Sequence, residues 1–588
     1  MVPKKYSSIP SAQSLVFHCK SRGIKNVVIS PGSRNAPLII GFTNDPYFSC
    51  YSIVDERSAA FFALGMAQHL QMPVLAVCTS GSALLNYYPA VAEAFYSDIP
   101  LVIVSADRPG YKVDIGDGQT IRQESLFEKH IGYSANLKQD LSHATRTIEK
   151  YDPSSFSNDY SLEQLQAQIQ NFNDAELNSA FKAAILQKSP VQINIPFEEP
   201  LYDIQEKQEL KPFCSPLNLE NSHKDINFEE LAQIWNSCEK KMMIIGVNNP
   251  GSINAGYLNT IANDDSVLIF TEVTSNVHHK NSFPSIDSII APIEKSKEKE
   301  LLFKELQPEL LITMGGLIVS KKVKAFLRQY KPKHHWHINN KKAFDTFFSL
   351  SRHIKTDENW FFEHFLEKIS EVPVDYCGKW NKVKQEYLIK RKAYLSQIPF
   401  SDFLAFHIIC SGIPNNYQLQ LANSSTVRYA QLFDLDPSLR VYCNRGTSGI
   451  DGSTSTAIGS SILAVNPTLL ITGDLSFFYD SNGLWNSYIR NDFRIIVINN
   501  GGGGIFRILP GKENSQNFET FFETVQDLDL QKICSLYNID HLVVEDKNSL
   551  NTALSTFYMP SDLPRLLEVK TPRLINDKIL LTYFDFIS

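Results

Sequence analysis

The 588-residue sequence lacks several features that mark specialised classes of protein. No uncharged apolar run approaches the roughly 18 residues of a membrane-spanning helix, and no apolar segment follows the lysines near the N-terminus. The nine cysteines form no C-x-x-C pair, which argues against a structural zinc site and suits reduced thiols. The formal net charge of −7 gives no general attraction for nucleic acid. We therefore expect a cytoplasmic protein with no integral membrane segment and no nucleic-acid partner.

The composition and the hydrophobic pattern are those of a globular α/β protein. Hydrophobic residues make up 43% of the chain and charged residues 20%. A chain of this length exceeds what one hydrophobic core accommodates, so several domains are expected. Short β-branched runs alternate with helix-length amphipathic stretches, which predicts parallel sheets. We expect three parallel-sheet α/β domains at residues 1–200, 226–375 and 399–588, with a polar linker at residues 202–226.

The strand candidates fall into three groups, one for each expected domain. The middle group carries no catalytic constellation, so we interpret it as a packing domain, and the basic run at residues 321–324 as a solvated helix face. The first and third groups are similar in size and style, which allows a duplication without demonstrating it. The candidates are residues 26–29, 74–78, 101–104 and 191–195, the last as a closing strand; 242–246, 267–270 and 310–314; and 441–443, 468–471, 494–498 and 566–569.

A glycine-rich pattern in the last third points to a diphosphate and its metal ion. Gly473-Asp474 ends one predicted strand, and Asn500 ends the next, just before the glycines at 501–504. Because adjacent parallel strands deliver their carboxyl ends to one crevice, Asp474, Asn500 and the Gly502 carbonyl could meet there. Such hard oxygen ligands suit Mg²⁺, and glycine amides add stabilisation of an anion. The alternative is a chance match between a Gly-Asp and an Asn-Asn turn.

An acidic helix start lies far upstream of this motif. Asp55 fits an N-cap, and Glu56 fits the first turn of an apolar, alanine-rich helix. Glu56 either complements the helix dipole or supplies an acid to a cofactor ring. On this segment alone both interpretations stay open.

Taken together, these motifs resemble the thiamine diphosphate-dependent enzymes. Further segments narrow the resemblance to the synthases that make 2-succinyl-5-enolpyruvyl-6-hydroxy-3-cyclohexene-1-carboxylate in menaquinone biosynthesis. The resemblance runs from residue 27 to about residue 510, and the middle domain matches only in length and style. The segments that carry it are residues 30–38, 79–89, 106–109, 118–123, 423–428 and 444–452.

This resemblance implies a transferase that uses thiamine diphosphate with Mg²⁺ or Mn²⁺. The enzyme would decarboxylate 2-oxoglutarate and add the resulting succinyl semialdehyde carbanion to isochorismate in a 1,4 sense. The first domain would bind the pyrimidine and the last domain the diphosphate. In relatives these parts come from different subunits, which implies a homodimer or a dimer of dimers.

The resemblance also assigns the site residues. Glu56 would be catalytic, at N1′ of the aminopyrimidine, and Ile450 would be an apolar wedge beneath the thiazolium, with a core isoleucine as the alternative. The metal ligands would be Asp474, Asn500 and Gly502. The other cofactor contacts would be Thr79, Asn86, Asn423, Ser424, Gly449, Gly473, Leu475, Ser476, Ile505 and Phe506, and the substrate contacts Ser33, Arg34, Arg108, Gln119, Ser424, Arg428, Arg445, Ile505, Phe506 and Leu509.

The substrates' charge favours the four arginines in this assignment. Each of the two substrates carries two carboxylates, which guanidinium groups bind through paired hydrogen bonds. The alternative for each arginine is a surface position. The sequence also departs from the family pattern: Gly118 stands where relatives often carry Asn, Gly504 stands where a larger polar residue is common, and residues 151–164 look inserted without an assigned role.

Three rival functions stay open at this point. An acetohydroxyacid synthase or a simple 2-oxo acid decarboxylase would not require four arginines around a doubly acidic acceptor. A non-catalytic nucleotide or phosphate-binding regulator could use the same fold. The presence of Glu56, Asp474 and Asn500 argues against this last possibility.

Overall fold

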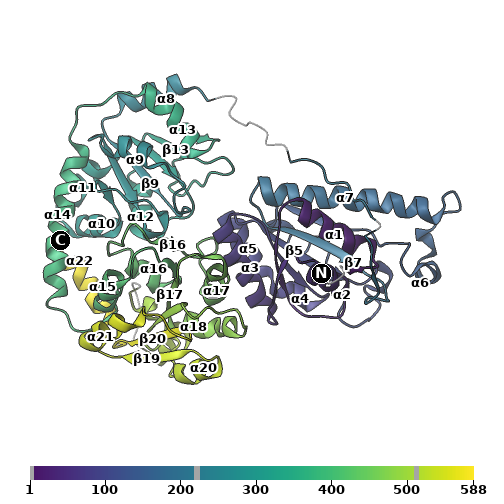
Figure 1. Ribbon diagram of the computed structural model, residues 1–588. Coiled ribbons are helices and arrows are strands. Elements are labelled where there is room, and N and C mark those ends of the chain that lie inside the picture. Colours follow the sequence, from purple (N-terminus) through teal and green to yellow (C-terminus); the bar gives the residue numbers. More distant parts are fainter. Residues whose placement is uncertain (1–4, 209, 218–225, 509–514) are drawn as a thin grey trace. The chain divides into compact units, whose positions relative to one another are not determined.

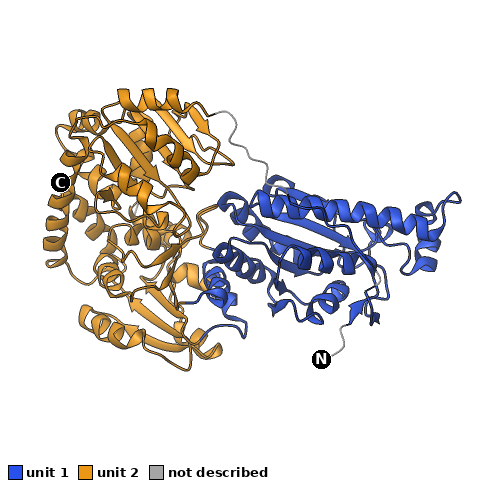
Figure 2. Cartoon of the chain, turned by 45° about the horizontal axis from the view of Figure 1, so that its top comes forward, with its two compact units in different colours: residues 1–219, 451–465, 479–490 blue, residues 220–450, 466–478, 491–588 orange. Residues whose placement is uncertain are grey.

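Three six-stranded sheets, in which every neighbouring pair of strands is parallel, organise the chain (Figure 1). A computed structural model describes residues 5–208, 210–217, 226–508 and 515–588. The predicted class, three parallel-sheet α/β domains, is confirmed. The chain forms two compact units (Figure 2): unit 1 comprises residues 1–219, 451–465 and 479–490, and unit 2 comprises residues 220–450, 466–478 and 491–588.

The first sheet belongs to unit 1 and contains the four strands predicted for it. The predicted closing strand is β7, which is the last strand of this sheet along the chain; it lies between β5 and β6, so β6 forms the edge. A short antiparallel pair joins β1 (Tyr6–Ser7) to β8 (Ile204–Gln205). The strand order is β3 (Ser49–Ser52), β2 (Asn26–Ile29), β4 (Val74–Cys78), β5 (Leu101–Asp107), β7 (Val191–Pro196) and β6 (Tyr133–Asn136).

The third sheet, in unit 2, repeats the strand order of the first. In both sheets the first strand in sequence lies between the second and the third, and the sixth lies between the fourth and the fifth. The first and third domains, which are similar in size and style in the sequence, therefore also share the same sheet topology. The order is β16 (Arg440–Tyr442), β15 (Gln418–Leu421), β17 (Thr468–Gly473), β18 (Arg494–Asn499), β20 (Arg565–Lys570) and β19 (Asp540–Val544).

The middle sheet, also in unit 2, has a different, doubly wound order. Its strand order reverses between β9 and β12, where ligands of such folds usually bind. Here the backbone fills that place, since a Cβ on Gly246 would lie 2.1 Å from the Gly316 carbonyl oxygen. The order is β11 (Ser282–Phe283), β10 (Val267–Thr271), β9 (Lys241–Ile245), β12 (Leu310–Met314), β13 (His334–Ile338) and β14 (Arg352–Ile354).

Helices cover the sheets and bury their apolar strands. In the described ranges, no helix combines the length and the apolar character needed to cross a membrane. The helices of unit 1 are α1 (Pro10–Ser21), α2 (Ala36–Thr43), α3 (Glu56–Leu70), α4 (Ser82–Asn86), α5 (Tyr88–Ser97), η1 (Gly110–Lys112), η2 (Glu128–His130), α6 (Thr145–Tyr151), η3 (Pro153–Ser155), α7 (Leu162–Leu186), α17 (Ser453–Leu463) and η6 (Ser481–Leu484).

Unit 2 holds the remaining helices, most of them between consecutive strands of its two sheets. They are α8 (Phe228–Ser237), α9 (Ala255–Ala262), η4 (Val273–Ser275), α10 (Ile286–Lys295), α11 (Lys299–Leu306), α12 (Lys321–Gln329), α13 (Glu358–Phe365), η5 (Leu366–Lys368), α14 (Tyr376–Leu395), α15 (Asp402–Gly412), α16 (Ser425–Ala430), α18 (Asp474–Tyr479), η7 (Gly504–Ile508), α19 (Gln516–Phe518), η8 (Glu519–Glu523), α20 (Leu530–Leu536), α21 (Lys547–Phe557) and α22 (Asn576–Phe586).

Two buried histidines of the middle sheet share one hydroxyl group. Thr313 Oγ1 lies 2.9 Å from His335 Nε2 and 2.8 Å from His337 Nδ1. A hydroxyl donates only one hydrogen bond, and the Trp336 carbonyl also lies 3.4 Å from Thr313 Oγ1, so at least one of the two imidazoles donates to the hydroxyl. Burial lowers the pKa of each histidine to about 4. Both imidazoles are therefore neutral in the folded protein at neutral pH.

This pair should make the fold sensitive to acid. The unfolded chain binds protons at these histidines below about pH 6.5, and the folded chain binds them only near pH 4, so stability is lost as the pH falls between these values. At pH 5 the loss is on the order of 2 kcal/mol for each histidine. We expect the double variant His335→Gln/His337→Asn to lose less melting temperature between pH 7 and pH 5 than the parent in calorimetry. The exposed His364→Gln serves as the control, and equal losses in all three proteins would contradict the prediction.

Candidate functional site

In unit 1, the turns that follow neighbouring strands of the first sheet meet at its carboxyl edge. The strand order reverses between β2 and β4, and Ser33 and Arg34 follow β2 while Thr79 follows β4. A Cβ on Gly32 would lie 2.4 Å from Thr79 Cβ, so the two turns are in contact. We call residues 30–35, 79–82, 107–109 and 118–123 the first edge. Ser33 is exposed on it and Thr79 is buried.

Two of the predicted arginines come together at the first edge. Arg34 is buried, and its Nη1 donates to the Phe197 carbonyl and its Nη2 to Glu199 Oε1, both over 2.9 Å. Arg34 Nε has no hydrogen-bond partner among the described residues. Burial, followed by the charge of Arg34, lowers the pKa of Arg108, whose Nη1 donates to Ser80 Oγ over 3.0 Å. Two adjacent guanidinium groups with a spare donor suit an acidic ligand.

The loop that carries Gln119 rests on the same edge. Gly81 has a φ of +85°, and a Cβ there would lie 3.0 Å from the Gln119 carbonyl oxygen. Gln119 itself is exposed, and Asn86 is exposed at the end of α4. The Gly118 carbonyl accepts from Arg108 Nη2 over 3.1 Å. A Cβ on Gly118 would meet no atom within 4 Å, so packing does not require glycine at this departure from the family pattern.

Glu56 begins helix α3, as the sequence predicts. The N-cap is Asp55, whose Oδ1 accepts from the Ser58 amide over 3.2 Å and whose Oδ2 accepts from Asn482 Nδ2 over 2.8 Å within unit 1. Asp55 is therefore the N-cap of α3, and Glu56 occupies the first turn of the helix. Burial raises the pKa of the nearby Cys78 thiol, and the charge of Glu56 raises it further. Glu56 is half-buried.

In unit 2, the third sheet forms a corresponding edge where its strand order reverses between β15 and β17. We call residues 423–428, 443–450, 473–476 and 499–506 the second edge. Asn423 connects its loops, because Nδ2 donates to the carbonyls of Asn444 over 2.6 Å and Gly449 over 2.7 Å. Oδ1 accepts from Arg445 Nη1 over 2.7 Å. One amide thereby fixes both the loop and an arginine.

The other two predicted arginines lie at the second edge. Arg445 is buried, and its Nε has no partner among the described residues. Arg428 Nη1 donates to the Ser424 carbonyl over 2.6 Å, and burial followed by the charge of Arg445 lowers the pKa of Arg428. Lys324 of α12 lies near both, and burial with these charges lowers its pKa. The expectation that residues 321–324 are only a solvated helix face is therefore wrong for Lys324.

The residues assigned to the metal gather at the ends of β17 and β18. Asp474 Oδ2 accepts from the Gly502 amide over 2.9 Å, and Oδ1 accepts from the Leu475 amide over 2.7 Å. Asn500 follows directly after β18, and its Nδ2 donates to Asp402 Oδ2 over 2.9 Å. Within the described ranges the Gly502 carbonyl accepts one hydrogen bond, from the Gly504 amide over 2.9 Å, which leaves its second lone pair available to a ligand.

The charges at this place fit a bound divalent cation. Asp474 and Asp402 are each 2% exposed, and burial, with a smaller effect of Asp402, raises the pKa of Asp474 to about 6. Among the residues that the structure describes, no lysine, arginine or histidine pairs with either carboxylate. Carboxylate, amide and carbonyl oxygens are the ligands that Mg²⁺ and Mn²⁺ prefer. The described ranges hold no metal-binding group of three or more His, Cys, Asp or Glu, so such an ion depends on these mixed ligands.

The glycines after β18 allow backbone conformations and close contacts that a larger residue would prevent. Gly501 and Gly502 have φ of +77° and +146°, and a Cβ on Gly502 would lie 2.8 Å from the Glu523 carbonyl oxygen. At Gly504 a Cβ would lie 3.2 Å from Asn500 Nδ2. Packing of Gly502 against the Glu523 carbonyl is therefore one reason for glycine here. The sequence suggested another reason, a close approach of the backbone to a ligand.

The remaining predicted residues lie on or beside the second edge. Ile450 is 37% exposed, so the alternative of a core isoleucine is wrong, and its carbonyl accepts from Ser476 Oγ over 2.7 Å. Ile505 and Phe506 are half-buried in η7, and Gly473 and Leu475 are half-buried at the end of β17 and the start of α18. Leu509 lies outside the described residues.

Sequence reasoning missed the groups that support this edge. Gln526 Nε2 donates to Asp474 Oδ2 over 3.1 Å. The buried Glu523 pairs with Arg507 and Arg573 and holds the Gly503 amide through its carbonyl over 2.6 Å. Glu523 is the last residue of η8, and Gln526 follows it shortly afterwards. The sequence around these two residues contains no recognisable motif, so no sequence signal pointed to them.

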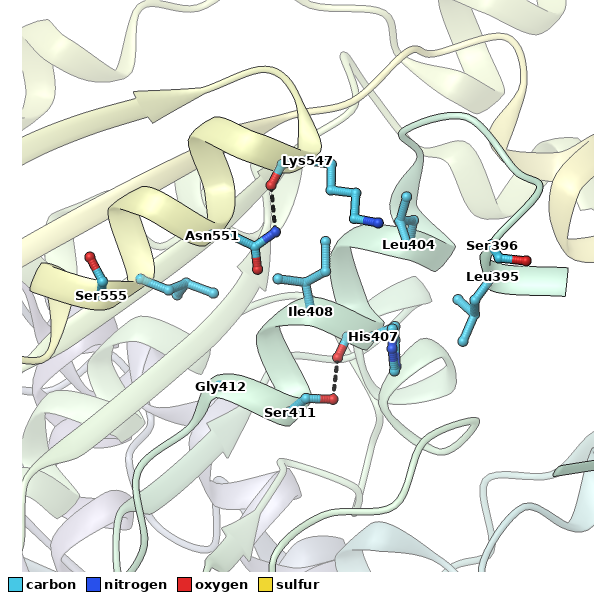
Figure 3. Close-up of a pocket in the computed structure, with 11 residues that line it drawn as sticks. Leu395, Ser396, Leu404, His407, Ile408, Ser411, Gly412, Lys547, Asn551 and Ser555 are labelled. Atoms are coloured by element: carbon cyan, nitrogen blue, oxygen red, sulfur yellow. Dashed lines mark hydrogen bonds between the residues drawn. The ribbon is translucent and has the colours of Figure 1, made fainter. Parts of the chain in front are cut away.

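One cavity elsewhere in unit 2 is separate from both edges. Its volume is about 620 Å³, and it lies between α15, α21 and the end of α14 (Figure 3). Ser411 and Asn551 turn their polar groups to carbonyls of their own helices. None of the predicted site residues lines it.

The amide of Asn423 should control the order of the second edge. In Asn423→Asp the carboxylate cannot donate, so two partly buried carbonyls lose their partner at a cost of about 1–3 kcal/mol each. We expect amide hydrogen exchange in residues 443–450 to become about tenfold faster or more, measured by mass spectrometry. Asn551→Asp, on the exposed face of α21, should leave this segment unchanged, whereas unaltered exchange in Asn423→Asp would contradict the role of the amide.

Two family models match the parts of the chain that contain these edges. Residues 11–129 match the model described as "Thiamine pyrophosphate enzyme, N-terminal TPP binding domain". Residues 423–569 match "Thiamine pyrophosphate enzyme, C-terminal TPP binding domain". A solved structure, benzoylformate decarboxylase from Polynucleobacter necessarius, has a TM-score of 0.67 at 14% identity and covers 96% of this chain and 98% of that chain, which shows a common fold.

Curated relatives match the chain over its whole length. A protein of Christiangramia forsetii named 2-succinyl-5-enolpyruvyl-6-hydroxy-3-cyclohexene-1-carboxylate synthase is 52% identical, covering 99% of this chain and 100% of the relative. A protein of the same name from Flavobacterium johnsoniae is 50% identical, covering 98% and 99%. The chain therefore belongs to the 2-succinyl-5-enolpyruvyl-6-hydroxy-3-cyclohexene-1-carboxylate synthase family and is a thiamine diphosphate-dependent enzyme of the carboligase type.

Proposed function

We propose that this enzyme decarboxylates 2-oxoglutarate and joins the remaining four-carbon unit to isochorismate by 1,4-addition. The products are CO₂ and 2-succinyl-5-enolpyruvyl-6-hydroxy-3-cyclohexene-1-carboxylate, in a step of menaquinone biosynthesis. The name of the full-length relatives supports this reaction. The proposal includes Mg²⁺ or Mn²⁺ as the metal and the cytoplasm as the location.

The observation that supports these substrates is the grouping of the arginines into two pairs. Arg34 and Arg108 lie together at the first edge, and Arg428 and Arg445 at the second. In each pair one buried guanidinium keeps an Nε donor without a partner in the described ranges. A buried donor without a partner is costly, so each pair is suited to a carboxylate ligand. Two substrates with two carboxylates each supply such ligands.

Thiamine diphosphate, when bound, supplies an electron sink for the loss of CO₂ and for carbon–carbon bond formation. Asp474, Asn500 and the Gly502 carbonyl would hold the metal ion that binds the diphosphate. Thr79, Asn86, Asn423, Ser424, Gly449, Gly473, Leu475 and Ser476 would make the other cofactor contacts, with Ile450 against the thiazolium. Ser33, Gln119, Ser424, Ile505, Phe506 and Leu509 would contact the substrates beside the four arginines.

Glu56 would exchange a proton with N1′ of the pyrimidine ring. Asp55 caps the helix and leaves the Glu56 carboxyl for this contact. The half-buried setting beside Cys78 limits water around the carboxyl and strengthens a hydrogen bond to the ring. The domains would be a pyrimidine-binding domain at residues 1–200, a central domain at 226–375 and a diphosphate-binding domain at 399–588. We propose a homodimer or a dimer of dimers, as the resemblance to the thiamine diphosphate enzymes implies.

The substrate pair is tested by release of CO₂ from 2-oxoglutarate in the presence of thiamine diphosphate and Mg²⁺. We expect isochorismate to accelerate this release about tenfold or more, because the acceptor completes the reaction. Product formation is followed by mass spectrometry, with pyruvate as the control donor. Rapid consumption of pyruvate without isochorismate would favour an acetohydroxyacid synthase or a simple decarboxylase, and no CO₂ from any 2-oxo acid would favour a non-catalytic binding protein.

The role of Glu56 is tested by Glu56→Gln. The amide has nearly the same size but no acidic proton, so we expect turnover to fall about 10²- to 10⁴-fold. Affinity for thiamine diphosphate with Mg²⁺, measured by titration calorimetry, should change little because the diphosphate contacts remain. Glu163→Gln, exposed on α7, is the control, and near-normal turnover in Glu56→Gln would remove Glu56 from the reaction.

A further inference from the structure

A buried carboxylate that no motif contains lies behind the proposed metal ligand Asn500. Asp402 is the first residue of helix α15, far from the residues at 473–504 in the sequence. Its side chain is 2% exposed, and burial raises the pKa of its carboxyl. A buried acid without a cation among its described partners is costly, so its retention calls for an explanation.

Each oxygen of Asp402 has its own partner. Oδ1 accepts from Thr571 Oγ1 over 2.5 Å, and Oδ2 accepts from Asn500 Nδ2 over 2.9 Å. The Asp402 amide donates to Asn576 Oδ1 over 2.9 Å. The carboxylate also lies at the N-terminus of α15, where the helix dipole favours negative charge. It is therefore held in one orientation from several directions.

These contacts determine which way the Asn500 amide faces. Both oxygens of Asp402 accept hydrogen bonds in the structure, and the group of Asn500 that meets Oδ2 is its NH₂. The side-chain oxygen of Asn500 therefore does not contact Asp402 and points away from it. A metal ligand at this position must present that oxygen, and a reversed amide would present hydrogens to the cation instead.

We propose that Asp402 is a positioning residue that orients Asn500 for the divalent cation. The inference rests on the proposed function, in which Asn500 binds that ion. Partners of this kind fix the orientation of metal ligands, and their loss typically weakens metal binding about 10- to 100-fold. Asp402 itself does not touch the substrates in this proposal.

A neighbouring pair in the same sheet provides a matched control. Asn499 Nδ2 donates to Glu568 Oε1 over 2.7 Å, another contact between an amide and a buried carboxylate, one residue before Asn500. Glu568 is 4% exposed and also contacts His541. Changing Glu568 removes a buried charge from the same region without touching the Asn500 amide.

The test measures binding of Mn²⁺ to the full-length protein saturated with thiamine diphosphate, by electron paramagnetic resonance. In Asp402→Asn one acceptor oxygen is replaced by an NH₂ group, which either donates to the Thr571 hydroxyl or meets Asn500 and favours the reversed amide. We expect the Kd for Mn²⁺ to rise about 10- to 100-fold. Thr571→Val, which leaves the Asn500 contact in place, and Glu568→Gln should each change this Kd less than about threefold.

A reciprocal exchange separates orientation from a general loss of structure. In Asn500→Asp/Asp402→Asn the two groups trade places, so an amide donor again meets a carboxylate acceptor. We expect this double variant to bind Mn²⁺ more tightly than Asp402→Asn alone. An unchanged Kd in Asp402→Asn, or equal weakening in Glu568→Gln, would overturn the role of Asp402 alone. Failure of the parent protein to bind Mn²⁺ with the cofactor would overturn the proposed metal site and, with it, this inference.

Discussion

The structure depends most on a concentration of negative charge at the ends of β17 and β18. Asp474 and Asp402 are buried beside the Asn500 amide, and no cation pairs with either acid among the residues described. Two such carboxylates repel each other in a medium of low dielectric constant. A divalent cation held by Asp474, Asn500 and the Gly502 carbonyl would offset this repulsion. The same buried carboxyl groups that are costly without a cation favour the binding of one.

Topology explains why chemistry is expected at two of the three sheets. The first and third sheets reverse their strand order next to their first strand and place turns with arginines and amides at that edge. The middle sheet reverses its order as well, but the backbones of Gly246 and Gly316 fill the equivalent place. This difference agrees with the absence of a catalytic motif from the middle part of the sequence.

Much of the fold follows from the sequence, because buried parallel strands are continuous apolar runs. Strand β15 escaped prediction since it alternates Gln and Leu, and yet Gln418 and Gln420 are 2% and 3% exposed. The motifs identified the residues at the ends of strands, such as Asp474 and Asn500. Supporting groups such as Asp402 and Gln526 could not be predicted, because they reach the site from segments whose proximity only the folded chain defines.

We propose that the acid at the start of α3 and the oxygens at the ends of β17 and β18 serve one cofactor molecule. The most direct test is a crystal structure of the enzyme with thiamine diphosphate and Mn²⁺, in which anomalous scattering locates the metal. We expect Mn²⁺ to be bound by Asp474, Asn500 and the Gly502 carbonyl, with Glu56 at the pyrimidine ring of the same cofactor molecule. A metal bound elsewhere, or a cofactor that reaches these ligands while no Glu56 of the assembly contacts its ring, would contradict it.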